Sequence, residues 1–88
     1  MIFQAITTRY IGPTNTRGSR VKATASAGSV TLHWDDALNS EQNHNRAAEA
    51  LANKFKWKGT YYGGGMPDGK GNVYVSADEP AFTTQGEV

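Results

Sequence analysis

The chain has 88 residues and no cysteine, which suffices for one thin apolar core and excludes a second domain, disulfide bonds and thiolate metal ligands. Nine Lys and Arg residues against eight Asp and Glu residues give a formal net charge of +1, so no strong overall field attracts duplex nucleic acid or anionic lipid. Any anion site must therefore be local.

Apolar runs in the sequence are short. None approaches the roughly 18 residues of a membrane span, and residues 1–11 alternate polar with apolar types where a signal peptide would have an apolar block. The absence of cysteine also suits a reducing compartment. We expect a soluble, cytoplasmic protein with no membrane partner.

The first part of the chain predicts three strands. Residues 2–11 are rich in β-branched and aromatic types and have no helix cap before them. Residues 19–25 and 29–35 alternate apolar with polar side chains, and the turn at 26–28 joins them. These last two segments are expected to form a hairpin with one face in the core.

The loop IGPTNTRGSR, residues 11–20, has residue types that fit a phosphate. Hydroxyls and glycine-flanked amides can line an anion nest, and an arginine can grip phosphate through two parallel hydrogen bonds. Turn geometry also requires Pro, Asn and Gly, and arginines keep a sheet edge soluble, so a plain connection fits as well. The candidate phosphate ligands are Thr14, Asn15, Thr16, Arg17, Ser19 and Arg20.

Residues 41–57 predict the single helix. Asn39 or Ser40 can cap its first turn, Gln42 stands three residues beyond Asn39 as in a capping box, and Gly59 is placed to end the helix. The stripe expected to pack on the sheet consists of His44, Ala48, Leu51 and Phe55, bordered by Ala47 and Ala52.

The glycine-rich segment after the helix predicts two short strands, around residue 61 and across 73–75, with a tight turn at 67–69. Consecutive glycines let a ligand approach the backbone, and adjacent tyrosines can stack on a base, although a flexible hairpin connection also explains the glycines. The order of residues matches no nucleotide-binding fingerprint. The candidate base-binding residues are Tyr61, Tyr62, Gly64 and Gly65.

Together these elements predict an α+β fold in the order β-β-β-α-β-β, an antiparallel sheet of about five strands with one helix on one face. We expect a single domain over residues 1–76 and a flexible polar tail over 77–88, frayed unless Phe82 docks. One helix covers only part of such a sheet, and four tyrosines exceed the needs of one thin core. A homo-oligomer is therefore expected.

Metal binding, catalysis and binding of a nucleic-acid single strand are further functions to consider for this sequence. Two histidines and nearby carboxylates lack metal-binding spacing, and no nucleophile elbow is present, so we expect no metal, no cofactor and no enzymatic activity. Basic residues near tyrosines can also support binding of a nucleic-acid single strand, but the balanced charge weighs against it. A metal would draw on His33, Asp35, Asp36, His44 and Glu49, and a single strand on Arg9, Arg17, Arg20 and Lys22.

Three segments, IGPTNTRGSRVKA, ALNSEQNHNRAAEALANKFKW and GGGMPDGKGNVYV, resemble short, largely uncharacterised accessory proteins of tailed phages, prophages and plasmids. The resemblance spans residues 6–75 and carries no motif with assigned chemistry. It implies a role in the cytoplasm of a bacterial host, where small phage proteins act against defence systems by occluding a protein complex or sequestering a nucleotide signal.

The hypothesis from sequence is a non-enzymatic homo-oligomer that binds and sequesters a phosphate-bearing nucleotide immune signal. In it, Arg17 and Arg20 grip phosphate, while Tyr61 or Tyr62 covers the base. Two alternatives remain open at this point: a protein inhibitor that occludes a host defence complex, in the manner of an anti-CRISPR protein, and a module for single-stranded nucleic acid.

Overall fold

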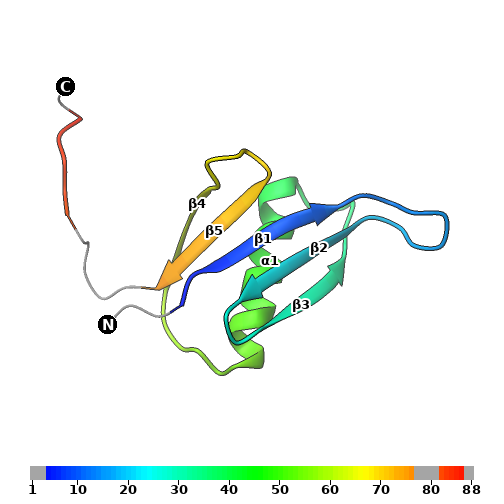
Figure 1. Cartoon of the computed structure of the whole chain (residues 1–88), viewed down its shortest axis with the longest axis horizontal. Helices are drawn as coiled ribbons and strands as arrows, with labels where there is room; N and C mark the ends of the chain where they lie inside the picture. Colours follow the sequence, from blue (N-terminus) through cyan, green and yellow to red (C-terminus); the bar gives the residue numbers. More distant parts are fainter. Residues whose placement is uncertain (1–3, 77–81, 87–88) are drawn as a thin grey trace.

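The computed structural model describes residues 4–76 and 82–86. It has an α+β fold, with one helix packed on a five-stranded antiparallel sheet whose strand order is β3-β2-β1-β5-β4 (Figure 1). The elements are β1 (Ile6–Ile11), β2 (Arg20–Ala25), β3 (Gly28–His33), α1 (Ser40–Lys54), β4 (Tyr61–Gly65) and β5 (Gly71–Ser76). The predicted fold class and element order are confirmed.

Two tight hairpins flank the central strand β1. In the first, a two-residue turn joins β2 to β3, with Ala25 opposite Gly28. In the second, the Met66 N–H donates to the Gly71 carbonyl (2.8 Å) and the Gly69 N–H donates to the Met66 carbonyl (2.9 Å). Gly69 has φ 71°, a left-handed conformation that glycine adopts without a Cβ clash. The turn predicted at 67–69 is confirmed.

The start of α1 follows the sequence prediction and its end does not. The Asn39 side chain accepts from the Gln42 N–H (2.8 Å) and the Gln42 side chain accepts from the Asn39 N–H (3.0 Å), which completes the capping box. The helix ends before Gly59, because Lys56 adopts the left-handed conformation (φ 58°). The Lys56 N–H and Trp57 N–H then bond to the carbonyls of residues 53 and 52.

The core lies between α1 and the strands β1, β2 and β3, on which the helix packs most extensively. Asn43, missed from sequence, is fully buried in this layer. Its side chain accepts from the Asp35 N–H (2.9 Å) and donates to the Asp35 carbonyl (3.0 Å), so it ties the helix to the preceding loop. The buried apolar residues are Ile6, Val21, Ala23, Ala47, Ala48, Leu51, Ala52 and Tyr74.

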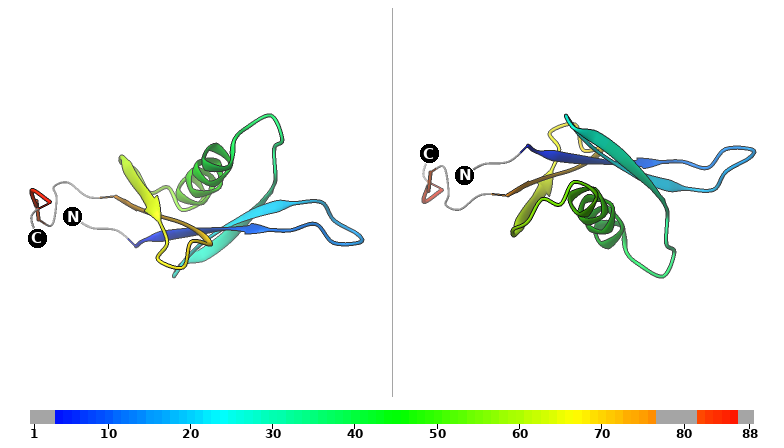
Figure 2. Two further views of the ribbon diagram at one scale, coloured as in Figure 1. Left: turned by 90° about the horizontal axis from the view of Figure 1, so that it is seen from above. Right: turned by 90° about the horizontal axis from the view of Figure 1, so that it is seen from below.

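The opposite face of the sheet is open. In Figure 2 the helix lies on one side of the strands, and in the part of the chain that the structure describes no element covers the other side. The four tyrosines divide accordingly: Tyr74 is buried, Tyr61 is half-buried, and Tyr10 and Tyr62 are exposed at 46% and 62%. One copy of the chain thus buries only part of its aromatic surface.

Two further sequence expectations concern the ends of the fold and membranes. Most of the predicted tail, residues 77–81 and 87–88, lies outside the described residues. Residues 82–86 form no helix or strand, and Phe82 is 79% exposed. Within the described ranges, no helix has the length and apolar character needed to cross a bilayer.

Candidate functional site

The open face of the sheet carries a cluster of basic and hydroxyl side chains. Residues of β1, β2 and β3 alternate between the helix and this face, so every second residue lies on it. The strand register aligns these side chains in three rows across the strands. The rows are Ile11, Arg20 and His33; Arg9, Lys22 and Thr31; and Thr7, Thr24 and Ser29.

Arg20 occupies a hollow of about 370 Å³ where the β1–β2 loop meets the open face. Thr16 and Arg17 of the loop line the same hollow, together with Thr31 and His33 of β3. The Arg20 side chain is half-buried, and its Nε is shielded from solvent and has no hydrogen-bond partner among the described residues. An unpaired, desolvated guanidinium nitrogen is costly unless an acceptor arrives. The hollow therefore suits an anion.

The β1–β2 loop is also ordered by its own hydrogen bonds. The Thr14 hydroxyl accepts from the Arg17 N–H (3.0 Å), and the Thr14 N–H donates to the Arg17 carbonyl (2.7 Å). The Ser19 hydroxyl bonds to the Tyr10 hydroxyl (2.8 Å). Thr14 and Ser19 thus already have structural partners, which fits the plain-turn interpretation of these two residues. Asn15 is exposed near the loop tip.

A second hollow, of about 320 Å³, continues the cationic surface toward the β4–β5 turn. It is lined by Arg9, Lys22 and Lys70, with Asp68 as its one acidic lining residue in the described chain. Arg9 stands directly opposite Lys22 across the two strands. Like charges in that position repel, and a bound anion relieves the repulsion. The basic strip, as we call Arg17, Arg20, Lys22, Arg9 and Lys70, thus extends from one loop to the other.

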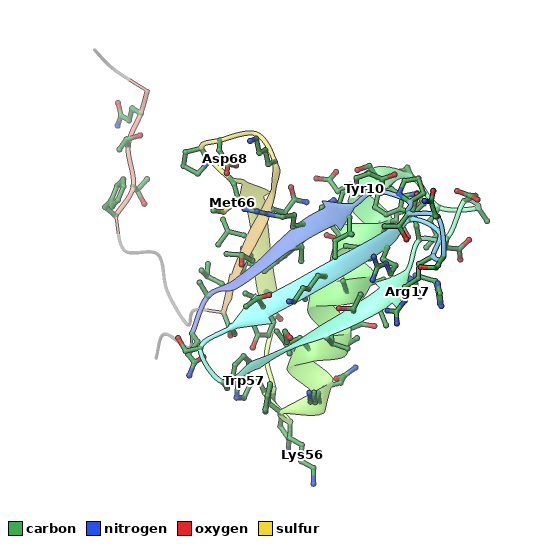
Figure 3. The ribbon with its side chains drawn as sticks, turned by 45° about the vertical axis from the view of Figure 1, so that its right-hand side comes forward. Tyr10, Arg17, Lys56, Trp57, Met66 and Asp68 are labelled. Atoms are coloured by element: carbon green, nitrogen blue, oxygen red, sulfur yellow. The ribbon has the colours of Figure 1, made fainter. Side chains whose placement is uncertain are left out.

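Acidic residues are distributed unevenly over the molecule, which the net charge of +1 conceals, although α1 and the residues after it also carry Arg46, Lys54, Lys56 and Lys58. In the described chain, four acidic residues lie on α1 or the loop before it, namely Asp35, Asp36, Glu41 and Glu49, while the open face of β1 to β3 has none. Figure 3 shows Arg17 on the β1–β2 loop and Asp68 in the β4–β5 turn, with Lys56 at the opposite end beyond the helix. The positive charge of the open face is therefore local to β1, β2 and the two adjoining loops.

The predicted base-binding residues lie on β4, at the opposite sheet edge from β3. β1 and β5 separate them from Arg20 on β2, so one chain does not bring the two predicted groups together. Tyr62 and Gly64 belong to the open face, whereas Tyr61 faces the helix layer. Gly65 is the last residue of the strand. Tyr62 and Arg20 can share a ligand only if it spans the sheet or bridges two copies.

The two histidines have separate environments. His44 is buried, and its Nδ1 lies 2.6 Å from the Thr8 hydroxyl. Burial lowers the pKa of His44, and the charge of Glu41 partly opposes that effect. His33 is exposed on the open face. In the described residues no three His, Asp or Glu side chains are grouped so that they could hold a metal ion.

Comparison with protein-family models, with curated proteins and with solved structures gave no match to this chain.

Proposed function

We propose that this protein is a non-enzymatic binding protein whose open sheet face holds a phosphate-bearing nucleotide. Arg20 and Arg17 contact the phosphate in the hollow beneath the β1–β2 loop, and Thr16 and His33 offer further polar contacts. In the phage setting that the sequence resemblance implies, the protein sequesters a nucleotide immune signal in the cytoplasm of the bacterial host. Its assembly into a homo-oligomer, which would bring Tyr62 of one copy near another copy's arginines, is part of this proposal.

The observation that carries the proposal is the Nε of Arg20, shielded from solvent without an acceptor, in a hollow that contains a second arginine. No carboxylate of the described chain lines that hollow. A structural arginine of this kind normally pairs with a carboxylate or a carbonyl. Phosphate presents several acceptor oxygens to a guanidinium fork and fits the space left beside Arg17.

Calorimetric titration tests this assignment. We expect binding of one or more members of a panel of cyclic mononucleotides and dinucleotides, with pyrophosphate as the reference anion. The Arg17→Ala/Arg20→Ala double variant should lose at least about 2 kcal/mol of binding free energy. This value is the lower end of the range for loss of a desolvated charge pair, and it applies because Arg17 is exposed. The control variant Lys56→Ala/Lys58→Ala removes two positive charges that lie outside the basic strip. It should bind the nucleotide with the affinity of the wild type. Equal affinities in the two double variants would refute the assignment.

A second candidate, binding of single-stranded nucleic acid, is favoured by the length of the basic strip and by Tyr62 on the same face of the sheet. The dependence of affinity on salt concentration distinguishes single-strand binding from nucleotide binding. A strand that contacts four cations of the strip should give a slope of log affinity against log salt near about −3, at roughly −0.7 per phosphate. A ligand with one or two phosphates should give a slope near about −1.

A further inference from the structure

A second surface, on the helix side of the sheet, is independent of the phosphate site. Because α1 packs mainly on β1, β2 and β3, it covers the helix side of β5 only in part and leaves that of β4 largely exposed. There a groove of about 570 Å³ runs between the helix and the β4–β5 hairpin. Aromatic rings of Trp57, Tyr61 and Tyr74 line it. Figure 2 shows β4 beside the helix, at the edge of the sheet.

This groove is acidic, in contrast to the open face. Glu41 and Glu49 lie along its helical wall, and no Lys, Arg or His of the described chain lines it. On the groove floor, burial raises the pKa of Tyr74, a hydrogen bond from Asn72 lowers it, and the charge of Glu41 raises it. Carboxylates beside aromatic faces are the surroundings that Lys and Arg side chains prefer.

One polar atom in the groove lacks a partner. The Tyr61 hydroxyl is shielded from solvent and makes no hydrogen bond among the described residues. The other floor tyrosine differs, since the Tyr74 hydroxyl donates to the Asn45 side chain (2.5 Å) and accepts from the Asn72 amide (3.1 Å). Buried hydroxyls are normally satisfied, so Tyr61 marks a place where a ligand group completes the structure.

The backbone of β4 is available along the same groove. Met66 and Gly71 form a hydrogen-bonded pair, and pairs alternate along an antiparallel ladder, so the N–H and C=O groups of Tyr61, Gly63 and Gly65 are directed away from β5. The side chains at these three positions lie on the helix side of the sheet. Two of the three residues are glycines, which have no side chain beyond a hydrogen atom. Nothing on the glycines therefore hinders a further strand at the spacing of about 4.8 Å that a sheet requires.

The other edge of the sheet is protected. Along β3, Arg46 Nη2 donates to the His33 carbonyl (2.6 Å) and Lys54 Nζ donates to the Ser29 carbonyl (3.2 Å). These helix side chains occupy acceptors that an incoming strand would need. The β4 edge has no such bond among the described residues. In the described chain the two edges are thus chemically different, and β4 is the more open to pairing.

We propose that the β4 edge docks an extended segment of a partner protein with Lys or Arg at alternating positions. The segment pairs with the outward groups of Tyr61, Gly63 and Gly65 as a sixth strand. Its basic side chains enter the groove between Glu41, Glu49 and Trp57, and one of its polar groups pairs with the Tyr61 hydroxyl. A second copy fits less well, because pairing β4 with β4 would bring two acidic grooves together.

The test is selection of random heptapeptides against the immobilised full chain, followed by titration of a selected peptide by tryptophan fluorescence. We expect enrichment of β-branched peptides with Lys or Arg at every second position. Gly65→Pro removes one outward N–H without breaking a bond to β5, and should weaken the selected peptide at least tenfold. Glu41→Gln/Glu49→Gln should do the same. Gly64→Ala and Asp35→Asn/Asp36→Asn are the matched controls and should bind normally.

Several results would overturn the docking proposal. They are selection of acidic or unpatterned peptides, no selection at all, and binding that Gly65→Pro and the double Gln variant leave unchanged. Concentration-dependent dimerisation in sedimentation, abolished by Gly65→Pro, would also overturn it, because a second copy would then occupy the edge. Far-UV circular dichroism verifies that Gly65→Pro is folded, and the double Gln variant tests the groove if it is not. Arg17→Ala/Arg20→Ala should leave peptide affinity unchanged.

Discussion

Replacement of Lys22 by glutamine should stabilise the unliganded protein. Lys22 stands opposite Arg9 on the open face, and both side chains are exposed there. Two like charges about 6 Å apart in water repel by about 0.7 kcal/mol, and like pairs directly across strands cost roughly 0.2 to 1 kcal/mol. For a domain of this size, about 0.5 kcal/mol corresponds to a rise in Tm of about 2 to 4 °C. Binding of the anionic ligand should weaken at the same time.

Thermal unfolding followed by circular dichroism measures this effect at low ionic strength and in 1 M salt. The Debye length falls to about 3 Å in 1 M salt, so the gain in Tm should largely disappear there. Lys58→Gln, an exposed lysine after the helix, is the matched control and should leave Tm nearly unchanged. A lower Tm for Lys22→Gln, or a gain that persists in high salt, would refute the inference that unrelieved repulsion is present on this face.

Three further predictions concern the helix side of the sheet. Tyr61→Phe removes an unpaired hydroxyl and should leave the free energy of unfolding unchanged or raise it by about 1 kcal/mol. Gly63→Ala should destabilise by about 1 to 3 kcal/mol, because its Cβ would lie 2.7 Å from the Tyr74 ring, whereas Gly64→Ala meets nothing within 4 Å. Burial lowers the pKa of His44 from 6.5, so stability should fall as pH drops below about 6.5 toward the lowered pKa, since the unfolded chain takes up the proton first.

Chemical denaturation measures the first two changes, and a pH series of the same curves measures the third. A Tyr61→Phe protein less stable by more than about 1 kcal/mol would show that the hydroxyl has a structural partner. Equal stability of Gly63→Ala and Gly64→Ala would contradict the close approach of the Tyr74 ring. Stability that is independent of pH between about 7 and 5 in the wild type, or a fall that His44→Gln leaves intact, would contradict the role given to this ring.

Local sequence patterns predicted the elements because they depend on neighbouring residues. The alternation in β2 and β3 and the reciprocal Asn39 and Gln42 bonds involve groups within a few positions of one another. The end of the helix was harder to predict, since a lysine at residue 56 took the left-handed conformation usually left to glycine. Asn43 was missed because the backbone groups that its side chain binds, those of Asp35, lie in the loop before the helix and come within reach only in the folded chain.

The two candidate surfaces were harder to predict from sequence than the helix and strands, because they depend on how the strands pair and where the helix packs. Sequence singled out Arg17 and Arg20, and alternation could have placed Arg20 beside Lys22, but the position of Arg9 opposite Lys22 requires the register of β1 on β2. The acidic groove had no local signal. Glu41 and Trp57 are sixteen positions apart, and they line one groove only because α1 leaves β4 largely exposed and covers β5 in part.

The Nε–H resonance of Arg20 tests the central claim most directly. In nitrogen-proton spectra of the arginine side chains, addition of pyrophosphate should shift the Arg20 resonance and slow its exchange with water. Arg46 Nε is also shielded and unpaired among the described residues, but it belongs to the helix, so its resonance should remain in place. An unchanged Arg20 resonance at saturating pyrophosphate, or equal shifts of both, would contradict the anion site on the open face.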